Sequence, residues 1–219
     1  MLAGMPGYAQ SQEQHSPARP VADTNEKTAG ASDQQRPKII VFGDSLSAAY
    51  GIQEEQGWVY LLQQTLTQRE FDWQIINASI SGETTGGGLK RLPQLLTNVN
   101  ASIVVLELGG NDALRGYPLS KIEENLRAMI ALIKAAGSQV ILVSMRIPPN
   151  YGPRYTRGFE RIYREIGAST DVIYMPFLLD EVALTPGMMQ PDGIHPTAKA
   201  QPLVLQSLMP YLEPLLGSN

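Results

Sequence analysis

Ser45 and His195 are the two residues of this sequence whose types could together perform nucleophilic catalysis. Ser45 stands in Gly43-Asp44-Ser45-Leu46-Ser47, directly after a short apolar run, where a serine usually serves only as a helix cap. Beside Gly43 it can instead occupy a tight turn as a nucleophile, and a helix following it would aim N–H groups at a developing oxyanion. Position 47 is serine rather than glycine, so the Gly-x-Ser-x-Gly elbow of α/β-hydrolases is not the template.

His195 is the single histidine beyond the N-terminal segment, since the other one is His15. A lone histidine is more often structural, but Asp192 lies three residues earlier and Gly193 permits a tight turn between the two. Such a turn can bring the carboxylate to Nδ1 and leave Nε2 to take a proton from a hydroxyl group. One histidine with nearby carboxylates does not form the three-ligand set of a catalytic zinc, so we predict no metal and no organic cofactor.

Two further loop residues, Gly82 and Asn111, could complete an active site with Ser45. Each follows an apolar run, and each on its own is typical of a simple turn. Ligands of open parallel sheets bind beyond the carboxyl ends of the strands, where these loops would meet. The N–H groups of Ser45 and Gly82 and the side-chain amide of Asn111 could then donate three hydrogen bonds to one oxyanion. We therefore favour a combined interpretation, with Ser45 as nucleophile, His195 as base and Asp192 as its partner.

Five short apolar runs rich in β-branched residues predict the strands that position these loops. Their near-continuous apolarity is typical of strands covered on both faces. The runs are Lys38–Phe42, Trp73–Asn77, Ile103–Leu108, Val140–Ser144 and Val172–Met175. Apolar residues at helical spacing fill the gaps, which predicts βαβ crossovers and a three-layer α/β/α sandwich with a mainly parallel, five-stranded, flavodoxin-like sheet. Pro210 should kink or end the last helix.

The composition excludes several other classes of protein. The 219 residues include no cysteine, which excludes disulfides, thiolate metal sites and a cysteine nucleophile. The formal net charge is −4, so we expect no nucleic acid partner. No apolar run approaches the length of a membrane-spanning helix, so we expect no stable membrane insertion. We expect a monomer that acts on a small molecule.

Residues 1–37 differ from the rest of the chain. They are dominated by small and polar residues, which predicts a disordered tail before one folded domain at residues 38–216. Residues 1–10 are similar to the last part of a secretory signal with a cut after Ala9, but they lack its cationic start and apolar stretch. Two interpretations stay open. A truncated export signal favours a periplasmic or secreted location, whereas a plain polar tail leaves a cytoplasmic location open.

The four polar loops together resemble the SGNH (GDSL) hydrolases, and within them the bacterial group of multifunctional esterases, arylesterases, thioesterase I and lysophospholipase L1. The resemblance spans residues 38 to about 214, and its motifs are Gly43–Ser47, Asn77–Gly82, Leu106–Asp112 and Asp192–Pro196. It implies a serine hydrolase with Ser45, His195 and Asp192 as catalytic residues and with Ser45, Gly82 and Asn111 lining the oxyanion hole. It also implies that the loop 112–119 lies beside the acyl chain. Glu83 stands where relatives often have aspartate.

The resemblance also implies the substrates, which would be aryl esters, short to medium acyl esters, acyl-CoA thioesters and lysophospholipids. The candidate substrate-binding residues are Asp44, Leu114, Tyr117, Ile147 and Tyr151, and the apolar members of this set favour an acyl chain. Three alternatives stay open. The first is a carbohydrate O-acetylesterase of the same family, with a small polar pocket, and the second is an inactive member that serves as an interaction domain. The third is a flavodoxin-like binding module, which would need a glycine-rich phosphate loop that the sequence lacks.

Overall fold

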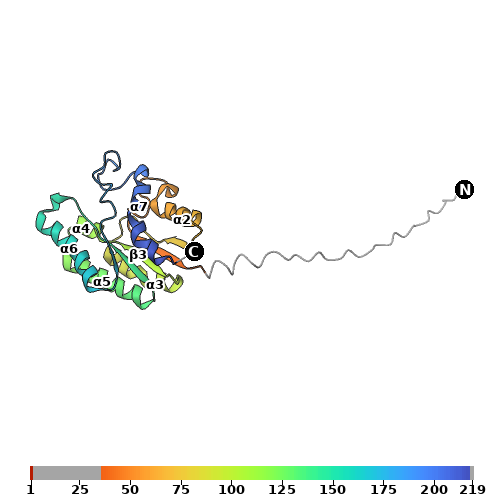
Figure 1. Cartoon of the computed structure of the whole chain (residues 1–219), viewed down its shortest axis with the longest axis horizontal. Helices are drawn as coiled ribbons and strands as arrows, with labels where there is room; N and C mark the ends of the chain where they lie inside the picture. The colour runs from red at the N-terminus through yellow and green to blue at the C-terminus, as the bar shows by residue number, and fades with distance from the viewer. Residues whose placement is uncertain (2–35, 218–219) are drawn as a thin grey trace. The chain divides into compact units, whose positions relative to one another are not determined.

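A five-stranded parallel sheet forms the centre of the folded part (Figure 1). The computed structural model describes Met1 and residues 36–217, so the predicted tail and its signal-like opening lie almost wholly outside the described residues. The strands stand in the order β2-β1-β3-β4-β5, and all four neighbouring pairs are parallel. They are β1 (Lys38–Gly43), β2 (Gln74–Asn77), β3 (Ile103–Glu107), β4 (Gln139–Val143) and β5 (Ile173–Met175).

Helices cover both faces of this sheet, with α2 packed on α7 at one face and α5 packed between α3 and α6 at the other (Figure 1). The α-helices are α2 (Trp58–Gln68), α3 (Thr85–Asn98), α4 (Gly110–Leu114), α5 (Leu119–Ala135), α6 (Pro153–Ser169) and α7 (Gln201–Leu212). Single 3₁₀ turns are η1 (Glu54–Gln56), η2 (Pro149–Tyr151), η3 (Ala198–Ala200) and η4 (Glu213–Leu215). The predicted three-layer α/β/α sandwich is confirmed.

The apolar runs form the core because both faces of the central strands are covered. Residues 39–42 of β1 and 103–107 of β3 are fully or almost fully buried, as are the inward-facing residues of α2, α5 and α6. Within the described residues, no helix is long and apolar enough to cross a membrane.

No α-helix begins at Ser45, so this serine is not a helix cap and no helix start at this position aims its N–H groups at the site. Turns occupy the chain from Asp44 to Gly51, and the first described α-helix, α2, begins only at Trp58. Ala49 and Gly51 have φ angles of 55° and 75°, which lie in the left-handed region and cannot continue a right-handed helix. The backbone N–H groups next to Ser45 therefore belong to a turn and not to the first turn of a helix.

Pro210 lies inside α7, which continues for two more residues and ends at Leu212. A proline inside a helix removes its own N–H donor. Only this hydrogen bond is lost near the end of the helix, because the C-cap residue Glu213 still donates its N–H to the Met209 carbonyl.

Candidate active site

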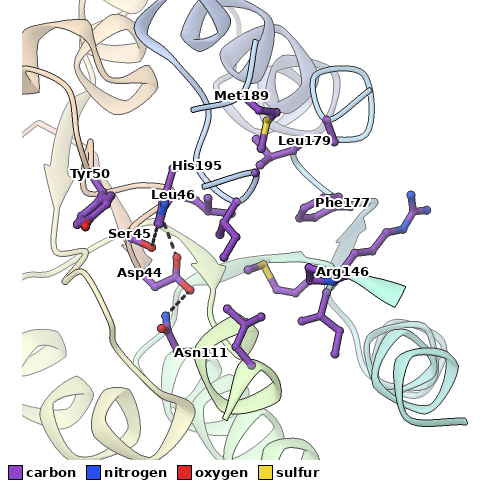
Figure 2. Close-up of a pocket in the computed structure, with 18 of the residues that line it drawn as sticks. Asp44, Ser45, Leu46, Tyr50, Asn111, Arg146, Phe177, Leu179, Met189 and His195 are labelled. Atoms are coloured by element: carbon purple, nitrogen blue, oxygen red, sulfur yellow. Dashed lines mark hydrogen bonds between the residues drawn. The ribbon is translucent and has the colours of Figure 1, made fainter. Parts of the chain in front are cut away.

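Ser45, His195 and Asp192 form a continuous hydrogen-bonded chain at the carboxyl end of the sheet. His195 Nε2 lies 2.9 Å from Ser45 Oγ (Figure 2), and His195 Nδ1 lies 2.6 Å from Asp192 Oδ2. Ser45 follows β1, whereas the other two residues lie in the segment between β5 and α7. The fold thus brings together the three residues that the sequence predicted, across 150 positions of the chain. This arrangement allows the imidazole to accept the serine proton while the carboxylate fixes the ring tautomer.

A tight turn holds Asp192 against the imidazole. Asp192 Oδ1 accepts the N–H groups of Ile194 at 2.9 Å and His195 at 3.0 Å, while Oδ2 binds the ring. Gly193 lies within this turn with φ of 67°, a conformation that favours glycine. Burial would raise the pKa of the Asp192 carboxyl, but hydrogen bonds from the His195 ring and the two N–H groups outweigh burial and lower it to about 2. The carboxylate therefore stays ionised beside the imidazole.

The turn that carries Ser45 is anchored by side chains from other elements. The indole Nε1 of Trp58 donates to the Leu46 carbonyl at 3.1 Å, and the Asn77 amide donates to the Ser47 carbonyl at 2.9 Å. The Leu46 N–H donates to Asp44 Oδ1 at 3.1 Å, which closes the turn locally. These contacts hold the turn of Ser45 from two different elements, because Trp58 begins α2 and Asn77 ends β2.

Three hydrogen-bond donors surround the space in front of Ser45. Asn111 Nδ2 donates to Asp44 Oδ2 at 3.0 Å, which leaves its second amide hydrogen for another acceptor. The N–H groups of Ser45 and Gly82 donate to no other group within the described residues. Ser45, Gly82 and Asn111 line one cavity together with His195. The three predicted oxyanion donors are thus gathered at one place and have capacity to bind a ligand oxygen.

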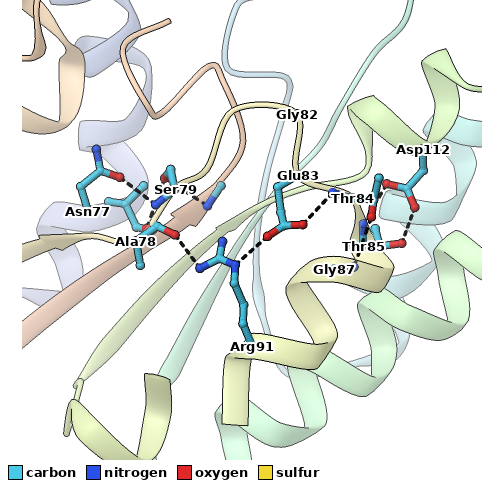
Figure 3. A network of polar contacts seen from close by, with 12 residues as sticks. Asn77, Ala78, Ser79, Gly82, Glu83, Thr84, Thr85, Gly87, Arg91 and Asp112 are labelled. Atoms are coloured by element: carbon cyan, nitrogen blue, oxygen red, sulfur yellow. Dashed lines mark hydrogen bonds and ion pairs between the residues drawn. The ribbon is translucent and has the colours of Figure 1, made fainter. Parts of the chain in front are cut away.

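Arg91 of α3 holds the loop that carries Gly82 in place through hydrogen bonds (Figure 3). The guanidinium donates to Glu83 Oε2 and to the Ala78 carbonyl, both at 2.7 Å, and lies 4.0 Å from the centre of the Phe42 ring. Glu83, the residue that departs from the family pattern, therefore has an ion-pairing role in this loop. At the start of α3, the Thr85 N–H and hydroxyl both donate to Asp112, at 2.8 and 2.6 Å. These bonds join the loop of Gly82 to the α4 segment that carries Asn111.

The cavity in front of Ser45 has a volume of about 700 Å³ and mostly apolar walls. Of the predicted substrate-binding residues, Asp44, Leu114 and Ile147 line it, and Tyr117 and Tyr151 do not. The hydroxyl of Tyr151 instead donates to the Leu114 carbonyl at 3.0 Å. The other apolar wall residues are Leu46, Met145, Pro148, Pro149, Phe177, Leu179, Ala183, Leu184, Met189 and Ile194.

Two functional neighbours of the catalytic chain were missed by the sequence analysis. The ring of Tyr50 lies 4.4 Å from the His195 ring, measured between centroids, and covers the imidazole (Figure 2). Glu107, at the end of β3, is completely buried next to Asp44. Burial raises the pKa of the Asp44 carboxyl, and burial together with the charge of Asp44 raises the pKa of Glu107 well above its usual range. Neither residue forms a recognisable sequence pattern, because Tyr50 lies seven residues after the end of β1 and Glu107 is a single acid inside an apolar run.

Within the described residues, no group of three or more histidine, aspartate or glutamate side chains is arranged to hold a metal ion. The site consists of a hydroxyl, an imidazole, a carboxylate and a set of N–H donors. Such a set can perform acyl transfer by nucleophilic attack of the serine, proton transfer through the histidine and stabilisation of an oxyanion.

The chain is similar in sequence and structure to known acyl hydrolases. The profile of the GDSL-like lipase/acylhydrolase family matches residues 41–202. The chain is 47% identical over 178 residues to esterase TesA from Pseudomonas aeruginosa, covering 81% of this chain and 89% of that protein. It is 40% identical over 181 residues to thioesterase 1/protease 1/lysophospholipase L1 from Escherichia coli K12, covering 83% and 86%. A crystal structure of the psychrotrophic esterase EstA from Pseudoalteromonas sp., inhibited by monoethylphosphonate, has a TM-score of 0.79 at 42% identity, covering 83% of this chain and 99% of that one.

Proposed function

The chain belongs to the GDSL-like lipase/acylhydrolase family and is an esterase, and we propose that it cleaves carboxylic esters and thioesters through an acyl-enzyme on Ser45. The observation that carries the assignment to Ser45 is the unbroken chain from Asp192 through His195 to Ser45 at the base of an apolar cavity.

In the acylation step, His195 Nε2 takes the proton of the Ser45 hydroxyl as Oγ attacks the acyl carbon. The carbonyl oxygen becomes an oxyanion, which accepts hydrogen bonds from the N–H groups of Ser45 and Gly82 and from the free amide hydrogen of Asn111. When the tetrahedral intermediate collapses, the bond to the leaving group breaks. The imidazolium then gives its proton to the departing alkoxide or thiolate, and the acyl group stays on Ser45.

In the deacylation step, a water molecule replaces the leaving group. His195 Nε2 takes a proton from this water, and the resulting hydroxide attacks the acyl carbon of the ester on Ser45. The second tetrahedral intermediate uses the same three donors. Its collapse breaks the bond to Ser45 Oγ, which recovers the proton from His195, and the carboxylic acid leaves. The ionised Asp192 stabilises the imidazolium in both steps.

The size and lining of the cavity favour an acyl chain over an acetyl group. A volume of about 700 Å³ with mostly apolar walls is far larger than an acetyl group needs, which counts against a carbohydrate O-acetylesterase. Each methylene of the acyl chain that moves from water into contact with these walls stabilises the bound substrate by about 0.8 kcal/mol. We therefore propose that medium-chain acyl esters, acyl thioesters and lysophospholipids are better substrates than acetates.

A covalent label tests the nucleophile directly. We expect a fluorophosphonate to add one adduct to the intact protein, mapped to Ser45, and nitrophenyl butyrate to be hydrolysed. Ser45→Ala should lose both the adduct and the turnover. Ser207→Ala, which removes a hydroxyl on α7 that bonds only the Leu203 carbonyl, should behave as wild type. A folded wild-type protein that takes no adduct would contradict the mechanism, and the binding-module alternative would then replace it.

We extend the proposal to location and assembly, with a monomeric enzyme that is exported to the periplasm or secreted. The support for export is the small-residue pattern before Ala9, which lies outside the described residues. Cell fractionation of the full chain, with sequencing of its N-terminus, tests this location, and recovery only in the cytoplasm would contradict it. Light scattering after gel filtration tests the monomer, since a dimer would double the mass.

A further inference from the structure

Glu107 is a fully buried acid beneath the turn that carries Ser45. It is the last residue of β3 and lies in register with Gly43, the last residue of β1. Its side chain is completely inaccessible to solvent, and the mechanism above assigns it no part. Burial of a carboxyl group costs free energy unless hydrogen bonds compensate it. The contacts of this side chain therefore indicate its role.

One oxygen of Glu107 accepts hydrogen bonds from both sides of the nucleophile. Oε2 accepts the Asp44 N–H at 3.2 Å and the Ser47 hydroxyl at 2.7 Å. Asp44 directly precedes Ser45, and Ser47 follows it by two residues. Because a single buried atom binds both ends of this short segment, its position restricts the path of the backbone between them.

Gly43 provides the space for this contact. A Cβ atom at position 43 would lie 2.4 Å from Glu107 Oε2, a distance that excludes any other residue unless the acid moves. The carboxyl group therefore occupies the space that a side chain at position 43 would take. Glu107 Oε1 has no hydrogen-bond partner within the described part of the chain, so the hydrogen bonds of this acid there all go to the nucleophile turn.

The environment of Glu107 favours the protonated form of its carboxyl group. Burial and the adjacent Asp44 carboxyl raise its pKa well above the usual range. The other ionisable group near it is the Tyr163 hydroxyl of α6, which donates to the Leu108 carbonyl at 2.7 Å and whose pKa is also raised by burial. Glutamine matches the shape of the protonated glutamate side chain, because the amide keeps one acceptor oxygen and carries no charge.

We propose that Glu107 is a positioning residue for the nucleophile, which sets the direction of Ser45 Oγ by holding the Asp44 N–H and the Ser47 hydroxyl on one buried oxygen. The proposal rests on the proposed function. The same contact places the Asp44 carboxyl, which in turn binds the Asn111 amide. Glu107 thus acts on both the nucleophile and an oxyanion donor without contact with the substrate.

The test compares Glu107→Gln with Glu107→Leu, using nitrophenyl butyrate and rates per active site titrated with a fluorophosphonate. Glu107→Gln should keep kcat within about threefold of wild type, since its oxygen can accept both hydrogen bonds. Glu107→Leu has similar volume but no acceptor, so kcat should fall about 10²-fold with KM nearly unchanged, as expected for a misplaced nucleophile. Ser138→Ala is the control. It removes a buried hydroxyl bond to the Ala101 carbonyl just before β4, and should lower stability without changing kcat.

The proposal is overturned if Glu107→Leu, folded by circular dichroism, keeps wild-type kcat, or if Glu107→Gln loses as much kcat as Glu107→Leu. Should Glu107→Leu not fold, Ser47→Ala decides. It removes one of the two donors and should lower kcat about tenfold at constant KM, and wild-type kcat would overturn the proposal. These outcomes are separate from a failure of the proposed function, which would appear as turnover by Ser45→Ala.

Discussion

The side-chain amide of Asn111 donates a hydrogen bond of 3.0 Å to the carboxyl group of Asp44, the residue directly before the nucleophile. One amide hydrogen is therefore fixed, and the planar amide directs the other along a single line. The bond also connects the loop after β1 to α4, which follows β3. Asp44 borders the cavity but is only 2% exposed. We therefore infer that its role is to orient Asn111 and not to contact the substrate.

We expect Asp44→Ala and Asn111→Ala to affect the same step. Loss of an oxyanion donor lowers kcat about 10²–10³-fold, and loss of the group that orients this donor should approach that value. The double variant should be little worse than Asn111→Ala, because the two residues act as one unit. The measurement is a double-mutant cycle of kcat with nitrophenyl butyrate. Multiplicative losses would mean that Asp44 acts independently of Asn111.

The low pKa of Asp192 predicts a pH-dependent contribution to stability. A carboxyl with a pKa of about 2 in the folded state and about 3.9 when unfolded stabilises the fold above pH 4, and this contribution is lost as pH falls towards 2. The free energy of unfolding of wild type should therefore exceed that of Asp192→Asn at pH 5, and the difference should shrink by pH 2.5. The effect should be modest, because the side chain is 39% exposed.

Urea unfolding of both proteins at pH 5, 3.5 and 2.5 measures this difference. Carboxyl groups elsewhere titrate equally in the two proteins, so the comparison removes their contribution. A difference that stays constant from pH 5 to 2.5 would contradict the prediction.

Gly193 and Gly137 provide a matched pair of glycines for testing the turn between Asp192 and His195. Both have positive φ angles, 67° and 83°, and a Cβ atom at either position would meet no other atom within 4 Å. Replacing either glycine by alanine should therefore lower the free energy of unfolding by a similar amount, about 1–2 kcal/mol from the left-handed backbone alone. Gly193→Ala should also lower kcat about tenfold, because Asp192 and His195 flank the turn. Gly137→Ala, between α5 and β4, should keep wild-type kcat, and equal kcat for both variants would contradict this.

Much of the candidate site could be predicted because parallel strands bring their carboxyl ends to one edge. Ser45, Gly82 and Asn111 each follow a strand that an apolar run predicts, and parallel strands were enough to place the three residues close together. The turn between Asp192 and His195 could also be predicted, because the two residues are only three positions apart and Gly193 lies between them.

The remaining parts depend on tertiary register, which no local pattern records. The sequence predicts only that Glu107 lies at the end of an apolar strand. Its pairing with Gly43 in the sheet places it beneath Ser45. The side chain of Gln190 bonds the carbonyls of Tyr50 and Pro196, and so joins the nucleophile loop to the histidine loop across 140 residues. Local pattern also does not show that the chain turns after Ser45 instead of starting a helix there, because the positive φ of Ala49 is not a property of alanine but of the fold around it.

The last prediction concerns the acyl chain. Phe177 lines the cavity on the side away from Ser45 (Figure 2), so only a long chain should reach it. Phe177→Ala should lower kcat/KM about tenfold for nitrophenyl decanoate and leave nitrophenyl butyrate unchanged, because one to two methylenes at about 0.8 kcal/mol each lose their apolar contact. Phe71→Ala is the matched control. Phe71 is also partly buried beside an arginine, Arg69, but lies outside the cavity, so its variant should keep the wild-type chain-length profile. An equal loss for both esters in Phe177→Ala would mean that the chain does not extend towards this wall.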